Sequence, residues 1–156
     1  MRQFTLPLDD TQRRPTILLN EALTALFDTG AYMPIWTDDE NILISELDGK
    51  LVKENVPFTG FGEETTGNLY QVTITVGQLI FPNMHIIANS ELETSYNLIL
   101  SATMFEGLSY EINTHTHNIV FTVFKDEDLV RNIVIEDKDG EIHVLCFSGN
   151  VDLKRE

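Results

Sequence analysis

Near the middle of the chain, apolar and polar side chains alternate strictly, and this alternation constrains the fold more than any other feature. The apolar positions are Tyr70, Val72, Ile74 and Val76, with glutamine or threonine between them. A period of two places these apolar side chains on one face of a β-strand. A Gly-Gln pair at 77–78 then favours a turn, and residues 79–88 return as a second strand. Pro82 must occupy an edge or a bulge, because proline cannot donate to a strand ladder. The sequence therefore predicts a β-hairpin.

Most of the remaining chain also consists of short apolar segments between turn residues. Strands are predicted at 16–19, 22–27 and 98–100, and two more hairpins at 110–112 with 119–124 and at 133–135 with 142–147. A capping-type serine and a terminal glycine predict a two-turn helix over residues 101–107. Residues 38–47 fit a short helix, with a strand as the open alternative. The pattern predicts an all-β fold, a small barrel or a sandwich, with one short helix.

Size and charge restrict the number of domains and the kinds of partner. The 156 residues, 42% of them hydrophobic, suit one domain with a sizeable core. The formal net charge of -15 repels nucleic-acid phosphates and anionic membrane surfaces. No apolar run approaches the roughly 18 residues of a membrane span, and Cys146 is the only cysteine, so an internal disulfide is impossible. We therefore expect a soluble, cytoplasmic protein with no nucleic-acid or membrane partner.

The candidate for chemistry is the tripeptide Asp28-Thr29-Gly30, at the end of the strand predicted at 22–27. Such tripeptides also form ordinary turns, so the surrounding residues must decide between a turn and a catalytic loop. Three apolar residues precede this tripeptide and Ala31 follows it. The complete string resembles the active-site loop of retropepsin-type aspartic proteases.

Later segments resemble the same family in order and spacing. The glycine-punctuated residues 58–67 are similar to the family's flap hairpin, whose glycines suit a mobile lid. Residues 98–105 resemble the apolar strand and short helix of the family, and residues 110–112 with 119–123 resemble its closing hairpin. The resemblance implies a small closed barrel of the retropepsin type.

The resemblance also suggests a division of the chain. Residues 16–124 form the retropepsin-like catalytic domain, and residues 1–15 precede it as a loosely held N-terminal arm. Residues 125–156 lie outside the resemblance. Their predicted hairpin either extends the sheet of the dimer interface or is a separate addition to the fold.

By resemblance, Asp28, Thr29 and Gly30 are the catalytic residues. The substrate-binding surface is expected to comprise loop and flap residues, namely Ala31, Tyr32, Gly60, Phe61, Gly62, Thr66 and Gly67. Hydrolysis of this type needs two carboxyl groups that share a proton, a behaviour established for aspartic-protease dyads as a class. No second Asp-Thr-Gly or Asp-Ser-Gly occurs, so the partner carboxylate must come from a homodimer. The expected activity is that of an endopeptidase acting on peptides or proteins, with no metal or other cofactor.

Two positions depart from the family pattern. Tyr32 stands where serine or threonine is usual, which puts the hydrogen-bond support of Asp28 in doubt. Ser101 stands where glycine is usual, which is expected to crowd the chain behind the catalytic loop. These departures leave an alternative, a catalytically inactive retropepsin-like module that binds peptides or dimerises. A third interpretation is an acidic decoy of DNA. His115 and His117 lack a third metal ligand, so solvent exposure is favoured over metal binding.

Overall fold

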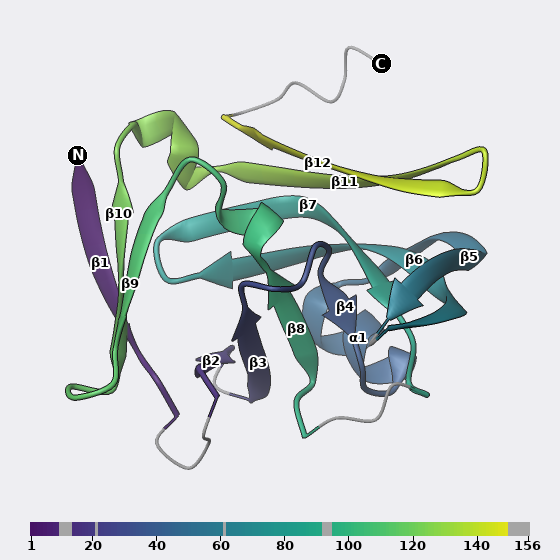
Figure 1. Ribbon diagram of the computed structural model, residues 1–156, viewed down its shortest axis with the longest axis horizontal. Helices are drawn as coiled ribbons and strands as arrows, with labels where there is room; N and C mark the ends of the chain where they lie inside the picture. Colours follow the sequence, from purple (N-terminus) through teal and green to yellow (C-terminus); the bar gives the residue numbers. More distant parts are fainter. Residues whose placement is uncertain (10–13, 21, 61, 92–94, 150–156) are drawn as a thin grey trace.

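The computed structural model describes residues 1–9, 14–20, 22–60, 62–91 and 95–149, and β-strands dominate it (Figure 1). The strands are β1 (Arg2–Pro7), β2 (Thr16–Leu19), β3 (Leu23–Asp28), β4 (Ile35–Trp36), β5 (Lys50–Gly60), β6 (Glu63–Val76), β7 (Leu79–Ala88), β8 (Leu98–Ser101), β9 (Ser109–Asn113), β10 (Asn118–Val123), β11 (Arg131–Lys138) and β12 (Glu141–Ser148). The predicted all-β class is confirmed. All three predicted hairpins are present, as β6-β7, β9-β10 and β11-β12.

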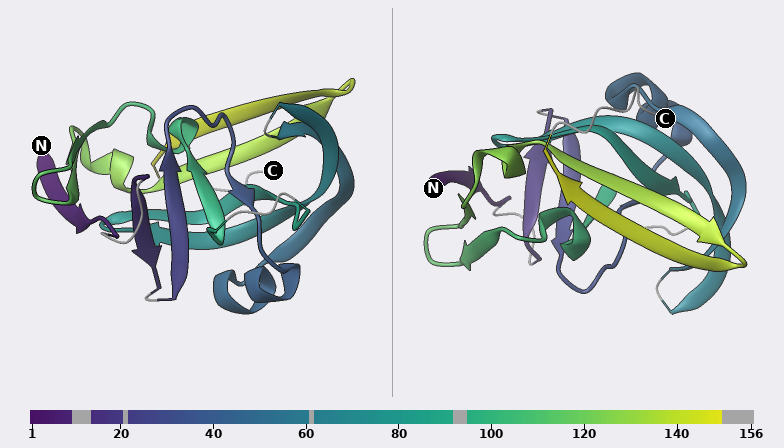
Figure 2. Two further views of the ribbon diagram at one scale, coloured as in Figure 1. Left: turned by 60° about the horizontal axis from the view of Figure 1, so that its bottom comes forward. Right: turned by 90° about the horizontal axis from the view of Figure 1, so that it is seen from above.

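The strands belong to three sheets. The largest has the order β2-β3-β8-β4-β7-β6-β5, and the others are β1-β10-β9 and the pair β11-β12. The predicted closure into a barrel is not observed: the large sheet ends at β2 and β5, and among the described residues the only pairing outside the three sheets is an isolated parallel bridge between Ile80 and Val130. The long β5-β6 hairpin of the large sheet bends strongly, and the turn of the β11-β12 hairpin lies near it (Figure 2).

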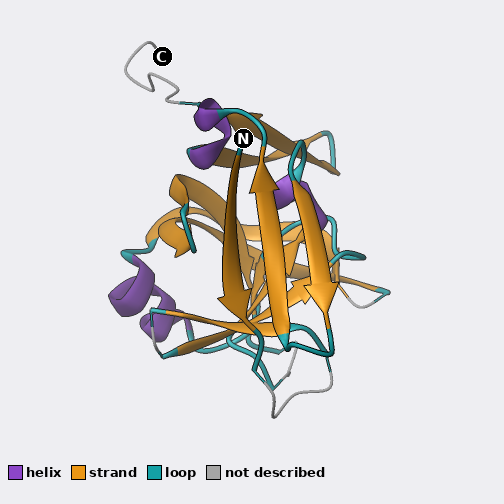
Figure 3. Cartoon of the chain, turned by 90° about the vertical axis from the view of Figure 1, so that its left-hand side faces the viewer, coloured by secondary structure: helices purple, strands orange, loops and turns teal. Residues whose placement is uncertain are grey.

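The N-terminal segment contains a strand that the sequence analysis did not predict. β1 pairs with β10 in antiparallel register and forms an edge of the three-stranded sheet (Figure 3). Phe4 is buried, and its ring stacks on Phe121 at a centroid distance of 5.1 Å. Residues 2–7 are therefore anchored to the core, in contrast to the loosely held arm expected there.

The helices are short. Residues 38–47, for which a helix or a strand was expected, contain the helix α1 (Glu40–Leu47). The Asp39 carboxylate caps this helix by accepting a hydrogen bond from the Asn41 amide at 2.8 Å. The two-turn helix predicted over 101–107 is wrong in type, since a 3-10 helix, η1 (Ala102–Phe105), occupies that place. A second 3-10 helix, η2, spans Asp126–Leu129. No helix in the described ranges combines the length and apolar character needed to cross a membrane.

Pro82 lies at a bulge, as predicted. The register between β6 and β7 shifts between the pairs Val72↔Met84 and Ile74↔Phe81, so two residues of β7 face Thr73. The Thr73 hydroxyl donates to the Pro82 carbonyl oxygen at 2.8 Å. The hydroxyl thus gives the Pro82 carbonyl oxygen a donor at the place where the bulge interrupts the ladder.

The C-terminal hairpin is an integral part of the packed structure. Ile133 and Ile135 of β11 are buried, and β11 packs along β7. The Ile135 amide donates to Nδ1 of His85 in β7 at 3.0 Å, so His85 has a partner that the sequence analysis did not foresee. The buried surface of this hairpin contributes to both hydrophobic clusters of the protein.

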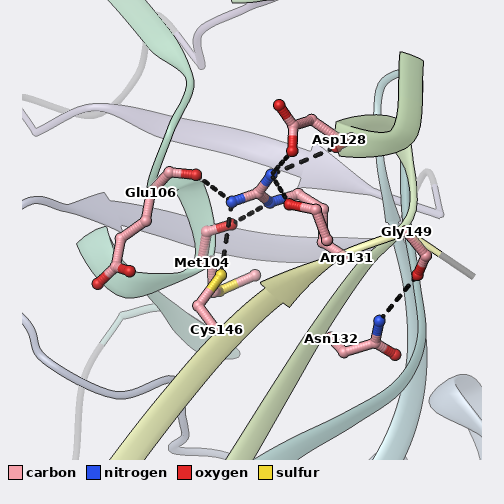
Figure 4. A network of polar contacts seen from close by, with 8 residues as sticks. Met104, Glu106, Asp128, Arg131, Asn132, Cys146 and Gly149 are labelled. Atoms are coloured by element: carbon pink, nitrogen blue, oxygen red, sulfur yellow. Dashed lines mark hydrogen bonds and ion pairs between the residues drawn. The ribbon is translucent and has the colours of Figure 1, made fainter. Parts of the chain in front are cut away.

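A buried cation fastens this hairpin to η1 (Figure 4). The Arg131 side chain is 1% exposed and donates to the carbonyl oxygens of Met104, at 2.8 Å, and Glu106. Its guanidinium also lies 3.8 Å from the Asp128 carboxylate and 3.4 Å from the Cys146 sulfur. Burial raises the pKa of the Cys146 thiol, which fits the inert, partly buried cysteine that the sequence suggests.

Candidate active site

Strand β3 carries Asp28 from the core to the surface. The preceding residue, Phe27, is buried, and its ring packs against Phe105 and Tyr110 at centroid distances of 5.0 and 4.9 Å. On one side, β8 runs parallel to β3 and places Ser101 opposite Asp28. The Asp28 side chain keeps 25% of its exposure. A partly exposed carboxylate therefore emerges from a rigid aromatic cluster, which fixes its position.

The backbone of the Asp-Thr-Gly turn orients the carboxylate. The Gly30 amide donates to Asp28 Oδ1 at 2.9 Å, and the Ala31 amide donates to the Asp28 carbonyl oxygen at 3.1 Å. A Cβ at Gly30 would lie only 3.3 Å from Oδ1, so glycine suits this close approach. The second oxygen, Oδ2, lies 4.0 Å from a guanidinium nitrogen of Arg14, whose side chain is 59% exposed. One oxygen is thus held by the loop, and the other faces a loosely associated cation.

The segment after β8 supports the loop from behind. The Ala102 amide donates to the Ala31 carbonyl oxygen at 3.1 Å, and the Thr103 hydroxyl donates to the Tyr32 carbonyl oxygen at 2.9 Å. Ser101 is buried with its hydroxyl 2.6 Å from that of Thr103. The side chain that was expected to crowd the loop therefore makes a hydrogen bond to the residue that holds it.

Tyr32 extends the loop toward the C-terminal hairpin. Its side chain is 50% exposed, and its hydroxyl donates to the carbonyl oxygen of Ile142 in β12. Burial raises the pKa of the Tyr32 phenol above its ordinary value, so the hydroxyl remains a donor at neutral pH. Tyr32 thus contacts the hairpin, while Asp28 Oδ1 accepts a hydrogen bond from the Gly30 amide.

A cavity of about 400 Å³ opens beside Asp28. Its described lining comes from the catalytic loop, the following strand, β8 and the β5-β6 hairpin, and consists of Asp28, Gly30, Ala31, Tyr32, Met33, Ile35, Thr59, Gly62 and Ile99. Most of these side chains are apolar, and Asp28 is the one charged member. An apolar cleft with a single oriented carboxylate makes this cavity the candidate ligand-binding site among the described residues.

The cavity includes half of the site residues predicted from the sequence. Those in its lining are Asp28, Gly30, Ala31, Tyr32 and Gly62. Thr29 is exposed in the turn, and Thr66 lies in β6, outside the described lining, while Gly60 is the last residue of β5. Phe61 lies outside the described residues. A hairpin, β5-β6, is present at residues 58–67, where the resemblance predicts a flap, and it contributes Thr59 and Gly62 to the cavity.

Gly67 has a packing role in this structure. A Cβ at this position would lie 2.6 Å from the Ile87 side chain and 2.7 Å from the Ala88 carbonyl oxygen. Glycine is therefore required for the close contact of β6 with β7, behind the flap. Its predicted role in binding substrate has no support from its location.

The sequence analysis did not identify four residues of the lining. Met33 and Ile35 follow the loop, and Ile99 lies opposite Ile35 in the ladder between β4 and β8. Thr59 lies within the glycine-rich segment 58–67, and this location was the one feature of the sequence that could have predicted its place in the lining. The others read as ordinary core residues, because apolar character alone does not distinguish a cavity wall from a packed interior.

The histidine and tryptophan candidates lie elsewhere. His115 and His117 are exposed in the turn between β9 and β10, and no group of three metal-ligating side chains occurs among the described residues. Trp36 is fully buried, and its indole nitrogen donates to the Asp39 carbonyl oxygen at 3.0 Å. Trp36 is thus a core residue and does not line the cavity.

In chemical terms, the site offers one oriented carboxylate, an apolar cavity and a hairpin that lies over it. A carboxylate can accept a proton from water, but cleavage of an amide also needs an acid for the carbonyl oxygen. Comparison of the sequence with models of known protein families and with curated proteins finds no match.

Proposed function

We propose that the protein is an aspartic endopeptidase that acts as a homodimer with a retropepsin-type arrangement of the catalytic loops. The observation that carries this proposal is the position of Asp28. Its carboxylate lies in the wall of an apolar cavity, with Oδ1 held by the Gly30 amide, and Thr59 and Gly62 of the flap hairpin line the same cavity. An extended peptide could be enclosed between these two walls.

The proposed reaction needs the Asp28 residues of two chains. One ionised carboxylate removes a proton from a water molecule, whose oxygen attacks the carbonyl carbon of the peptide bond. The other carboxyl group gives its proton to the carbonyl oxygen, which produces a tetrahedral diol. When the carbon–nitrogen bond breaks, the nitrogen takes the proton of the protonated carboxyl group and leaves as an amine, while one diol hydroxyl gives its proton to the ionised carboxylate, which leaves a carboxylic acid and restores the dyad. Thr29 is exposed at the turn, where it would face the second loop across the twofold axis.

Arg14 is the observation that favours the alternative function. Its guanidinium lies 4.0 Å from Asp28 Oδ2 and therefore competes with a second carboxyl group for the outer oxygen. In an inactive module, this ion pair would persist, and the cavity would bind a peptide without cleaving it. The Arg14 side chain is 59% exposed, so its displacement by a partner chain costs little.

Cleavage of a peptide library at mildly acidic pH tests the proposal. We expect cleavage that pepstatin-class inhibitors block and that Asp28→Asn abolishes, with the dimer retained in sedimentation experiments. Asp126→Asn is the matched control, because Asp126 is an exposed aspartate that pairs with Arg2. Peptide binding without turnover, unaffected by Asp28→Asn, would favour the inactive module. Competition for a DNA-binding protein, independent of Asp28, would favour the DNA decoy.

A further inference from the structure

A second cavity shares Tyr32 with the cavity beside Asp28. Its volume is about 440 Å³. The described residues that line it come from the catalytic loop, from both strands of the flap and from the turn of the C-terminal hairpin: Tyr32, Met33, Pro57, Phe58, Thr59, Glu64, Thr65, Gly140 and Ile142. We call it the outer cavity. Its hairpin wall belongs to the part of the chain outside the retropepsin resemblance.

The outer cavity adjoins the Asp28 cavity. Tyr32, Met33 and Thr59 line both, so the two cavities are neighbours along the same loop and hairpin. The hydrogen bond from Tyr32 to the Ile142 carbonyl fixes the hairpin at this place. Successive residues of an extended peptide advance by roughly 3.3 Å. A peptide bound at Asp28 would therefore place a side chain in the outer cavity a few residues from the bond that is cleaved.

The lining of the outer cavity suits a long side chain with an apolar stem and a positive end. Phe58 and Met33 are buried and offer an apolar surface. Glu64 is exposed at the rim, and the described residues provide it with no ion pair. No lysine or arginine occurs in the described lining. Lysine and arginine pack their methylene stems on apolar surfaces and keep the charge in water, and their cations also bind tyrosine rings.

We propose that the outer cavity is a specificity subsite for a lysine or arginine of the peptide substrate, with Glu64 as the residue that selects the charge. This inference rests on the proposed peptidase function. It adds a substrate class, peptides with a basic residue removed from the cleaved bond, and it assigns the C-terminal hairpin to the binding surface.

The first arm of the test measures cleavage. Peptides that differ only in lysine, alanine or glutamate at each position around the cleaved bond are compared by kcat/KM. At one position remote from that bond, we expect lysine to be preferred over alanine by about two- to fivefold, the range of an exposed ion pair. Glu64→Gln should remove this preference, and Glu64→Lys should reverse it toward glutamate. Glu111→Gln, which removes the same charge from exposed β9, should leave the preference intact.

The second arm measures binding to the Asp28→Asn protein by fluorescence anisotropy of the same peptides. Lysine-dependent binding that Glu64→Gln removes supports the subsite even if the native protein cleaves nothing, which would defeat only the peptidase function. Cleavage and binding that are indifferent to Glu64 would overturn the subsite and leave the peptidase standing. If no peptide in the set is bound or cleaved, both proposals fail.

Discussion

The Tyr32 hydroxyl and the Ile142 carbonyl oxygen form a hydrogen bond between residues 110 positions apart in the chain. One end belongs to the loop that carries Asp28, and the other belongs to the C-terminal hairpin. Because Tyr32 lines both the Asp28 cavity and the outer cavity, this bond joins the hairpin to the wall of the candidate active site.

Replacing Tyr32 by phenylalanine removes this hydrogen bond and keeps the ring. We expect the free energy of unfolding to fall by about 0.5–1.5 kcal/mol, the usual contribution of one hydrogen bond. Urea denaturation measures that loss. Amide hydrogen exchange in the turn between β11 and β12 should accelerate, because the hairpin loses its contact with the loop. Unchanged exchange there would show that the hairpin is held without Tyr32.

Replacing Arg131 by methionine should destabilise the protein severely. The substitution leaves the carbonyl oxygens of Met104 and Glu106 without their donor and leaves the Asp128 carboxylate, 15% exposed, without its cation. Removal of one partner from such a buried arrangement costs about 3–5 kcal/mol, which urea denaturation would detect.

The control for Arg131 is Arg2→Ala. Arg2 lies 3.5 Å from Asp126 in an exposed ion pair, so its loss should change the free energy of unfolding by less than about 1 kcal/mol. Equal effects of the two substitutions would contradict the structural role assigned to Arg131.

His85 should make stability depend on pH. Burial lowers the pKa of His85 in the folded protein below its ordinary value of 6.5, and Nδ1 accepts from the Ile135 amide. The unfolded chain therefore binds a proton at a higher pH than the folded protein does. The stability contributed by neutral His85 is fully present above pH 6.5 and is lost as the pH falls through the lower folded pKa.

Urea midpoints of the native protein and of His85→Gln, compared between about pH 7.5 and about pH 5.5, measure this effect. Glutamine can still accept a hydrogen bond but does not titrate. The variant should lose less stability on acidification than the native protein. Identical pH dependence of both proteins would show that His85 is not the responsible group.

A chain that ends at Phe124, the limit of the retropepsin resemblance, should not fold cooperatively. It lacks Ile133 and Ile135, which are buried in the two hydrophobic clusters, and it lacks Arg131. Thermal melting followed by near-ultraviolet circular dichroism would test this. A chain that ends at Gly149 is the control, since it keeps these contacts. A sharp transition in the shorter chain would mean that residues 1–124 fold without the C-terminal hairpin.

Local patterns predicted the elements that depend on local chemistry. The alternation from Tyr70 to Val76 identified the hairpin, and the missing amide hydrogen of Pro82 identified the bulge. Asp28 stood out because its tripeptide has a recognisable context. These features are determined by a few neighbouring residues, so the sequence contains enough information to predict them.

Features that depend on distant contacts were missed. Phe4 is the one buried side chain of β1, so the hydrophobic pattern of residues 2–7 did not predict a strand that pairs with β10. Ser101 was judged by its size, whereas its effect depends on the direction of its hydroxyl toward Thr103. The contact of Tyr32 with Ile142 was also missed. The periodicity of a strand predicts which of its faces is buried, but it does not predict which other element covers that face.

The contacts that Arg131 makes with Met104 and Glu106 have a consequence for protein synthesis. η1 supports the loop of Asp28 from behind, and the cation that secures η1 is translated only after both of them. A nascent chain that has left the ribosome only as far as β10 therefore lacks the hydrogen bonds from Arg131 to η1 and Glu106. We therefore expect the loop that carries Asp28 to receive this support only after the last hairpin has emerged and docked.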